Sequence, residues 1–190
     1  MKPSTEAPLR AAPIVVMGVS GSGKTTFGSA LARLLGRDFV DGDDLQSASN
    51  IDKMRRGHAL DDSDRAPWLR SVAALLADHA SHPTGLVVAC SALKRTYRDV
   101  LRSARGVRFV FLDADRSLVE QRLDSRSGHF MPRTLIESQF DALERPGPAE
   151  CDVSTFDAAL PLEAGVRAAA ELFVRRVCSA DFQEDAISRS

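Results

Sequence analysis

The chain has 190 residues, a formal net charge of −1 at neutral pH and a hydrophobic content of 44%. This length suits one domain with a full core, and the near-neutral charge offers no global basic field for nucleic acid. No apolar stretch approaches the length of a membrane span, so we expect no membrane partner. The three cysteines are odd in number and widely spaced, which favours reduced thiols in a cytosolic setting.

Strand and helix patterns alternate along the chain. Apolar runs predict strands over 14–17, 38–41, 86–90, 107–112 and 153–156. Helical patterns fall between them, over 24–35, 50–56, 61–79, 94–102, 117–125, 134–143 and 162–177. We expect Ser49 or Asn50 to cap the helix over 50–56. Strands separated by helices imply a mostly parallel five-stranded sheet with helices on both faces, a three-layer α/β fold. The domain is expected over 13–178, with 1–12 as a disordered leader and 179–190 as a frayed tail.

A glycine-rich segment follows the first predicted strand and fits the pattern G-x-x-x-x-G-K-[ST] at every fixed position. Its glycines allow the backbone to approach phosphate oxygens, and the helix that follows presents its positive dipole end. Lys24 would reach the β- and γ-phosphates of ATP, and the Thr25 hydroxyl would hold Mg²⁺. The alternative is an ordinary turn between a strand and a helix. The predicted ATP-binding residues of this segment are Gly18, Val19, Ser20, Gly21, Ser22, Gly23, Lys24, Thr25 and Thr26.

Asp41-Gly42-Asp43-Asp44 follows the second predicted strand, at the edge where ligands bind such sheets. Asp41 and Asp43 are two residues apart and are able to face the same way. One carboxylate near Mg²⁺ and one on an acceptor hydroxyl are what a small-molecule kinase needs, so we expect Asp41 to bind the metal and Asp43 to accept a proton. The alternative is a solvated acidic turn.

Basic residues near the predicted strand ends are candidate ligands for anions. Lys94 and Arg98 are four residues apart, so we expect them to share a helix face and to bind an anionic group of the substrate. Ordinary helix-surface charge is the alternative. Lys53 and Arg65 are further candidate substrate ligands, and Arg65 stands just before Pro67 and Trp68, where an aromatic ring would hold it. An internal salt bridge is the alternative role for Arg65.

A second basic set surrounds a predicted loop that contains Gly128. Arg122 and Arg126 are also four residues apart, and Arg126 enters this loop. Phosphoryl transfer often uses arginine from a closing lid, so we expect a lid over about 122–133 with both arginines on ATP and Arg126 in a catalytic role. His129 is expected to bind substrate rather than metal, because no second histidine is near it in the sequence.

With these motifs in place, the sequence resembles the gluconokinase family, a branch of the small P-loop kinases that includes shikimate and adenylate kinases. The resemblance rests on the glycine-rich segment and on blocks elsewhere in the chain that are more particular to this family. These blocks are Asp41-Gly42-Asp43, Pro67-Trp68-Leu69, Cys90 to Arg98, Arg122, Arg126 with Gly128-His129-Phe130, and Ser138-Gln139-Phe140. Where this family usually reads Leu-His-Pro, the chain has Leu45-Gln46-Ser47.

The resemblance implies a P-loop kinase fold with a small lid, ATP and Mg²⁺ as cofactors, and D-gluconate as the acceptor. The implied product is 6-phospho-D-gluconate, formed at the terminal hydroxyl by a cytoplasmic enzyme that is often a homodimer. Family geometry also brings the loop near Leu160-Pro161-Leu162 close to the adenine base. A kinase for another sugar acid or for shikimate is the alternative, and a nucleotide-binding regulator without turnover is a more distant one.

Overall fold

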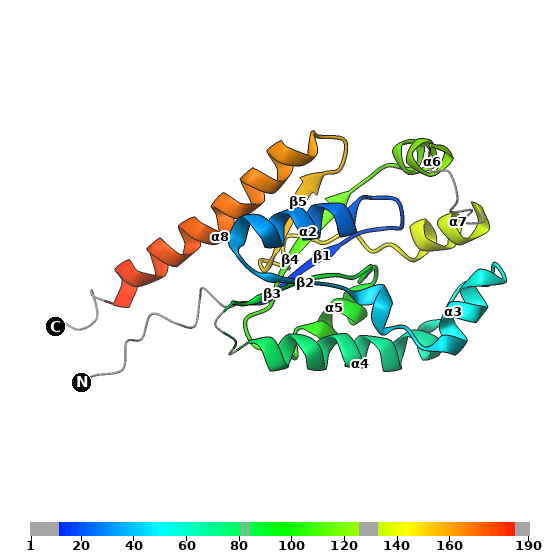
Figure 1. The fold of residues 1–190 in the computed structure, drawn as a ribbon, viewed down its shortest axis with the longest axis horizontal. Helices are drawn as coiled ribbons and strands as arrows, with labels where there is room; N and C mark the ends of the chain where they lie inside the picture. Colours follow the sequence, from blue (N-terminus) through cyan, green and yellow to red (C-terminus); the bar gives the residue numbers. More distant parts are fainter. Residues whose placement is uncertain (1–11, 81, 83, 126–132, 185–190) are drawn as a thin grey trace.

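A five-stranded parallel sheet forms the centre of the molecule (Figure 1). The computed structural model describes residues 12–80, 82, 84–125 and 133–184. The strands are β1 (Ile14–Met17), β2 (Asp38–Asp41), β3 (Leu86–Ala89), β4 (Arg108–Asp113) and β5 (Val153–Asp157). They lie in the order β2-β3-β1-β4-β5, and all four pairings are parallel. The predicted fold class is confirmed.

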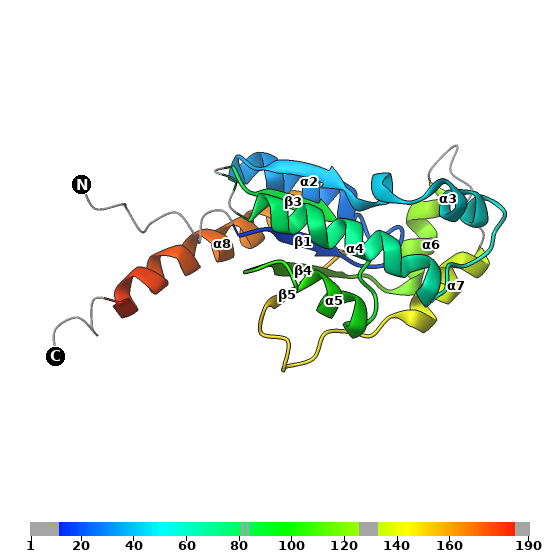
Figure 2. The ribbon, with the colours of Figure 1, turned by 90° about the horizontal axis from the view of Figure 1, so that it is seen from below.

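Helices cover both faces of this sheet, as the alternating pattern of elements requires. Helices α2 (Lys24–Leu35) and α8 (Leu162–Glu184) lie on one face, and α4 (Asp62–His79) and α5 (Arg95–Leu101) on the other (Figures 1 and 2). Successive strand residues supply the two faces in turn. Ile14 and Val16 join the buried cluster beneath α2 and α8, whereas Val15 and Met17 join the one beneath α4 and α5.

The remaining helices gather where the parallel strands end. They are the 3₁₀ helix η1 (Gly42–Leu45), α3 (Ala48–Arg55), α6 (Arg116–Asp124) and α7 (Arg133–Ala142). Figures 1 and 2 show α3, α6 and α7 at this end of the sheet, opposite the far end of α8. Folds of this kind bind ligands at the carboxyl ends of their parallel strands, so we expect the ligand-binding site at this end of the molecule.

Polar side chains fix the starts of the two helices on the acidic side of this end. Ser47 caps α3, its Oγ accepting from the Asn50 backbone N–H at 3.2 Å, so the predicted cap at Ser49 or Asn50 was wrong. Asp61 and Asp64 form a capping box at the start of α4, in which each carboxylate accepts from the other residue's backbone N–H. These caps hold α3 and the start of α4 in place beside the acidic η1 segment.

The predicted ends of the domain need one correction. Helix α8 continues to Glu184, so the tail expected to fray from 179 is helical for part of its length. Residues 1–11 of the leader predicted over 1–12 lie outside the described residues, as do the last residues, 185–190. Within the part of the chain that the structure describes, no helix has the length and apolar character needed to cross a bilayer.

Candidate active site

The glycine-rich segment wraps around the carboxyl end of β1 and leads into α2. Gly18 has φ 147°, and a Cβ there would lie 2.8 Å from the Leu112 carbonyl oxygen, so no other residue fits without movement. Gly23, with φ 96°, precedes α2 and offers no side-chain hydrogen bond to the helix start. The first turn of α2 also carries no acidic residue. The N-terminal N–H groups of α2 are therefore left for an anionic ligand.

The two predicted metal ligands touch each other. Thr25 Oγ1 donates to Asp41 Oδ2 at 2.7 Å, which joins the start of α2 to the end of β2. A hydroxyl and a carboxylate side by side suit Mg²⁺, which takes few protein oxygens and completes its shell with water and phosphate. Among the described residues no three His, Cys, Asp or Glu side chains cluster as a metal site, so the residues fit a metal shared with a nucleotide rather than a closed protein cage.

The turn between Asp41 and Asp43 is held from two sides. Trp68 on α4 donates its indole N–H to the Gly42 carbonyl at 2.6 Å. A Cβ at Gly42 would lie 2.6 Å from the Ala89 carbonyl oxygen, so glycine is needed for this approach to β3. The Asp43 backbone N–H donates to Asp41 Oδ1 at 3.1 Å. The structure therefore brings Asp41 and Asp43 together at one rigid turn beside Thr25.

The pKa of Asp43 is raised above its ordinary value. The largest cause is burial of the carboxyl among protein atoms, although the residue as a whole keeps an exposed surface. Lys24 opposes this shift by attraction, the carboxylates of Asp41 and Asp44 add to it, and Arg65 opposes it more weakly. A carboxyl whose pKa moves toward neutrality is a better proton acceptor than an ordinary aspartate, provided that it is ionised at the working pH.

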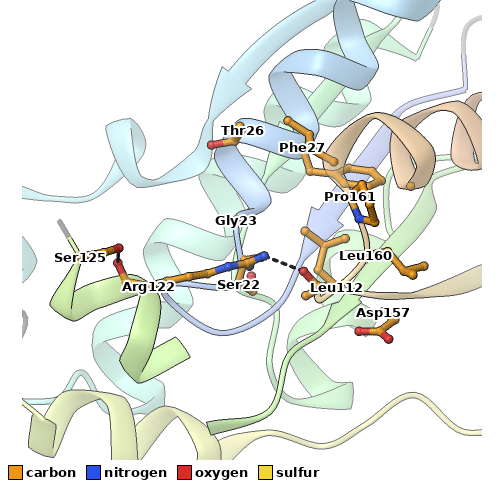
Figure 3. Close-up of a pocket in the computed structure, with 13 residues that line it drawn as sticks. Ser22, Gly23, Thr26, Phe27, Leu112, Arg122, Ser125, Asp157, Leu160 and Pro161 are labelled. Atoms are coloured by element: carbon orange, nitrogen blue, oxygen red, sulfur yellow. Dashed lines mark hydrogen bonds between the residues drawn. The ribbon is translucent and has the colours of Figure 1, made fainter. Parts of the chain in front are cut away.

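A pocket of about 250 Å³ opens beside the glycine-rich segment (Figure 3). Arg122 extends from α6 toward this segment, donating Nη1 to the Ser22 carbonyl at 2.7 Å and Nη2 to the Ala158 carbonyl at 2.6 Å. Thr26, Phe27, Leu160 and Pro161 also line the pocket. Its mixture of apolar walls and backbone groups suits an adenine base next to the phosphate loop. Phe27 and Asp157 were not expected here, because helical periodicity marks Phe27 only as a core residue.

A second pocket, of about 520 Å³, lies between the start of α4, the start of α5 and α7. Lys94 donates to both oxygens of Asp62, at 2.7 and 3.0 Å, and the Tyr97 hydroxyl donates to the same carboxylate. The hydrogen bonds from Lys94, and then from Tyr97, lower the pKa of Asp62. Asp62 and Tyr97 had no predicted role, because pairing between segments so far apart in the chain leaves no local pattern.

Arg65 lines the same pocket, as predicted for a substrate ligand. Its guanidinium carbon lies 6.0 Å from the centre of the Tyr97 ring, and its Nε donates to the Leu60 carbonyl at 3.3 Å. The aromatic partner is therefore Tyr97, whereas the sequence had pointed to Trp68. No ion pair holds Arg65 among the described residues, so its positive charge remains available to an anionic ligand in the pocket.

Arg98 does not share a face with Lys94, and this expectation was wrong. Lys94 is not helical: it is the cap that precedes α5, and it turns toward Asp62. Arg98 is 1% exposed and makes a two-pronged contact with Glu150, at 2.7 Å for each bond. Its Nη1 also donates to the carbonyls of Ala92 and Leu93. Arg98 is therefore a buried structural residue that holds the turn after β3, and not a free cation in the pocket.

The other predicted site residues are placed as follows. Lys53 pairs with Asp64 and lies 3.6 Å from Asp61, which ties α3 to α4; Asp61 lines the second pocket, whereas Lys53 is not among its lining residues. Arg126 and His129 lie outside the described residues, as does most of the predicted lid. Gln139 had no predicted role beyond its place in a matching block, yet it makes two hydrogen bonds to Ser20.

Comparisons with known proteins agree with this geometry. A family model described as an AAA domain matches residues 14–146. The thermosensitive gluconokinase of Escherichia coli (strain K12) is 49% identical over 145 residues, which cover 75% of this chain and 77% of that protein. The thermoresistant gluconokinase of the same organism is 42% identical over 160 residues, covering 83% and 91%. A solved gluconokinase structure from Sinorhizobium meliloti 1021 is 43% identical with a TM-score of 0.81, covering 91% of this chain and 97% of that one.

More distant solved structures share the fold alone. A shikimate kinase from Bacteroides thetaiotaomicron has 20% identity and a TM-score of 0.59, over 85% of this chain and 97% of that one. At this level of identity the match supports the three-layer architecture, and it carries no argument about the acceptor.

Proposed function

The chain belongs to the gluconokinase family, and from that premise we propose that it transfers the γ-phosphoryl group of ATP to the terminal hydroxyl of D-gluconate. The products are ADP and 6-phospho-D-gluconate. The observation that carries the proposal is the position of Asp43. Asp43 lies in the turn after β2, where its backbone N–H donates to Asp41 Oδ1 at 3.1 Å, and Asp41 in turn accepts from Thr25 at the start of α2, which supports an acceptor hydroxyl meeting the γ-phosphate at this turn.

In this proposal ATP binds along the glycine-rich segment and in the pocket of Figure 3. The start of α2 and the buried Lys24 ammonium meet the phosphates, and the apolar walls at Phe27 and Pro161 hold the base. Arg122 keeps the segment in shape through its bond to the Ser22 carbonyl. Arg126 is proposed to add positive charge at the γ-phosphate.

Mg²⁺ is proposed to bind at Thr25 and Asp41, whose oxygens already touch. When bound, the ion supplies charge neutralisation on the β- and γ-phosphate oxygens. The Thr25 hydroxyl donates its hydrogen to Asp41 and keeps its oxygen lone pairs, so it can offer one of them to the ion without losing this bond.

Gluconate is proposed to occupy the second pocket. Its carboxylate is proposed to face the Arg65 guanidinium, which makes no ion pair among the described residues. Lys94 and Asp62 offer a donor and an acceptor for the hydroxyl groups along the chain of the sugar acid. His129 is a further proposed hydrogen-bond partner. The mixed charges of this pocket suit a polyhydroxy acid better than an apolar acceptor.

The chemical step follows from these positions. Asp43 orients the terminal hydroxyl and accepts its proton as the oxygen attacks the γ-phosphorus. The new oxygen–phosphorus bond forms while the bond from the γ-phosphorus to the bridging oxygen of ADP breaks, and Lys24 stabilises the charge that develops on the phosphates.

A coupled ADP-release assay over a panel of sugar acids and shikimate tests the proposed function. Gluconate should support the highest kcat/KM, and the rate without any acceptor should stay near background. A gluconate rate no higher than the rate without acceptor would refute the proposal, and a better rate with another acid would reassign the substrate.

We also propose a cytoplasmic homodimer: the free thiols of Cys90 and Cys151 support a reducing compartment, and light scattering of the full chain tests the dimer.

A further inference from the structure

Helix α7 reaches the nucleotide segment through one side chain, that of Gln139. The Gln139 Oε1 accepts from the Ser20 backbone N–H at 2.7 Å, and its Nε2 donates to Ser20 Oγ at 2.9 Å. The two bonds together fix both the place and the orientation of the peptide at the tip of the glycine-rich segment. They join residues that are 119 positions apart in the chain, so they are a tertiary contact and not part of the local turn.

The same helix forms a wall of the proposed acceptor pocket. Ser138 and Ala142, one helical turn apart, line this pocket together with Arg65 and Lys94. Just after the helix, the Glu144 carboxylate accepts from the Arg95 backbone N–H at 2.7 Å. Helix α7 is thus attached to the acceptor pocket along one side and to the start of α5, next to Lys94, at its end.

Buried apolar contacts also anchor α7 between these two places. Ile136 is 5% exposed and belongs to the buried cluster that also contains Val19 of the nucleotide segment and Leu93 of the turn after β3. A close-packed cluster of this kind transmits small displacements instead of absorbing them. A displacement of α7 therefore reaches Ser20 through this cluster and through the pair of hydrogen bonds from Gln139.

We propose that Gln139 is the positioning residue through which α7 couples the acceptor pocket to the nucleotide segment, so that each substrate binds more tightly when the other is present. A sugar acid that contacts α7 holds the helix in place, and the helix holds the Ser20 peptide. The nucleotide then binds a segment whose position is already fixed. This inference rests on the proposed function, because it needs gluconate in the second pocket.

Calorimetric titration of the full chain with a non-hydrolysable ATP analogue and Mg²⁺, with and without saturating gluconate, measures this coupling. For the unmodified chain we expect gluconate to lower the Kd of the analogue by about fivefold or more. Gln139→Met keeps the side-chain volume and removes both hydrogen bonds, and it should bring this ratio close to one. Glu137→Met, an exposed neighbour on the same helix, should keep the full ratio.

A conservative variant separates positioning from general damage. Gln139→Glu keeps an acceptor for the Ser20 N–H and should retain most of the ratio, even where its added charge weakens nucleotide binding overall. An unchanged ratio in Gln139→Met, or a ratio of one in the unmodified chain when both ligands bind, would overturn the coupling alone. Tighter analogue binding in Gln139→Met would also overturn it, since that result means Gln139 restrains the segment. Gluconate that fails to bind the unmodified chain at all would overturn the proposed function as well.

Discussion

The two pockets at the carboxyl end of the sheet, the nucleotide pocket of Figure 3 and the second, acceptor pocket, are lined by different kinds of chemical group. The phosphate-binding part of the nucleotide pocket uses backbone groups of one contiguous segment, and α2 begins at Lys24 without any side-chain cap to compete for its N–H groups. The acceptor pocket uses charged side chains from two separate segments, the start of α4 and the cap of α5, and some of these already neutralise one another, as Lys94 and Asp62 do. Local spacing in the sequence is therefore enough to predict a site made of backbone groups. The role of a charged side chain, in contrast, depends on which partner the fold places beside it.

Removing the proton acceptor that stands between the two pockets should have the largest effect. Asp43→Asn keeps the shape of the side chain but cannot take the proton, so we expect kcat to fall by about 10²- to 10⁴-fold. Binding of an ATP analogue should be retained, because the nucleotide pocket does not use this carboxylate. Asp44→Asn, in the same 3₁₀ helix, is the matched control and should keep normal turnover. Near-normal kcat in Asp43→Asn would show that the base is another group.

The buried cation near the acceptor pocket should matter for stability rather than for substrate affinity. The hydrogen bonds from Arg98, and then those from Arg102, outweigh burial and lower the pKa of Glu150 to about 2. Arg98→Met leaves this buried carboxylate with only part of its compensation, so we expect a loss of about 3 kcal/mol in the free energy of unfolding. Chemical denaturation measures it. A large rise in KM for gluconate at unchanged stability would instead indicate that Arg98 binds the substrate.

The half-buried cation of the acceptor pocket should behave in the opposite way. Arg65→Met removes a charge that makes no ion pair among the described residues, so we expect KM for gluconate to rise by about 10- to 100-fold. KM for ATP and the free energy of unfolding should stay close to their normal values. Initial rates with each substrate varied in turn give both constants, and a rise in the ATP constant alone would show that the two pockets are not separate.

The pH dependence should report the raised pKa of Asp43. The base works only when ionised, so kcat/KM should fall as the pH drops through a value above the ordinary 3.8 of an aspartate. A raised pKa also means that the fold favours the protonated form, so ionised Asp43 costs stability at neutral pH. Asp43→Asn should therefore be slightly more stable than the unmodified chain at neutral pH, with the difference vanishing below pH 3.8. Equal stability at both pH values would contradict the raised pKa.

Sequence reasoning succeeded where the physical cause is local. The period of the apolar residues predicts all five strands, and the pattern from Gly18 to Thr25 predicts the phosphate-binding turn because each residue type has its own role in the backbone. The pairing of Thr25 with Asp41 also follows, since parallel strands that end together bring their last residues to one edge.

Sequence reasoning failed where a residue distant in the chain determines the position and role of a side chain. Helical spacing placed Lys94 and Arg98 on one face, but Lys94 stops short of the helix and the carboxylate of Glu150, 52 residues on, draws Arg98 into the core. The hydrogen bonds between Gln139 and Ser20 could not be predicted either, because no local pattern in one segment indicates contact with the other. Ser47, a departure from the usual family pattern, caps α3 in this chain, which intrinsic cap preference alone did not distinguish from Ser49 or Asn50.

Identifying the reaction product tests directly whether the chain phosphorylates the terminal hydroxyl of gluconate. Phosphorus NMR of the full chain with ATP, Mg²⁺ and gluconate should show ADP and one new phosphomonoester, split by the two protons of the terminal carbon of gluconate. The same signal should be absent without gluconate and strongly reduced with Asp43→Asn. Inorganic phosphate as the only product, or a phosphate split by a single proton, would contradict an enzyme that phosphorylates the terminal hydroxyl of a sugar acid.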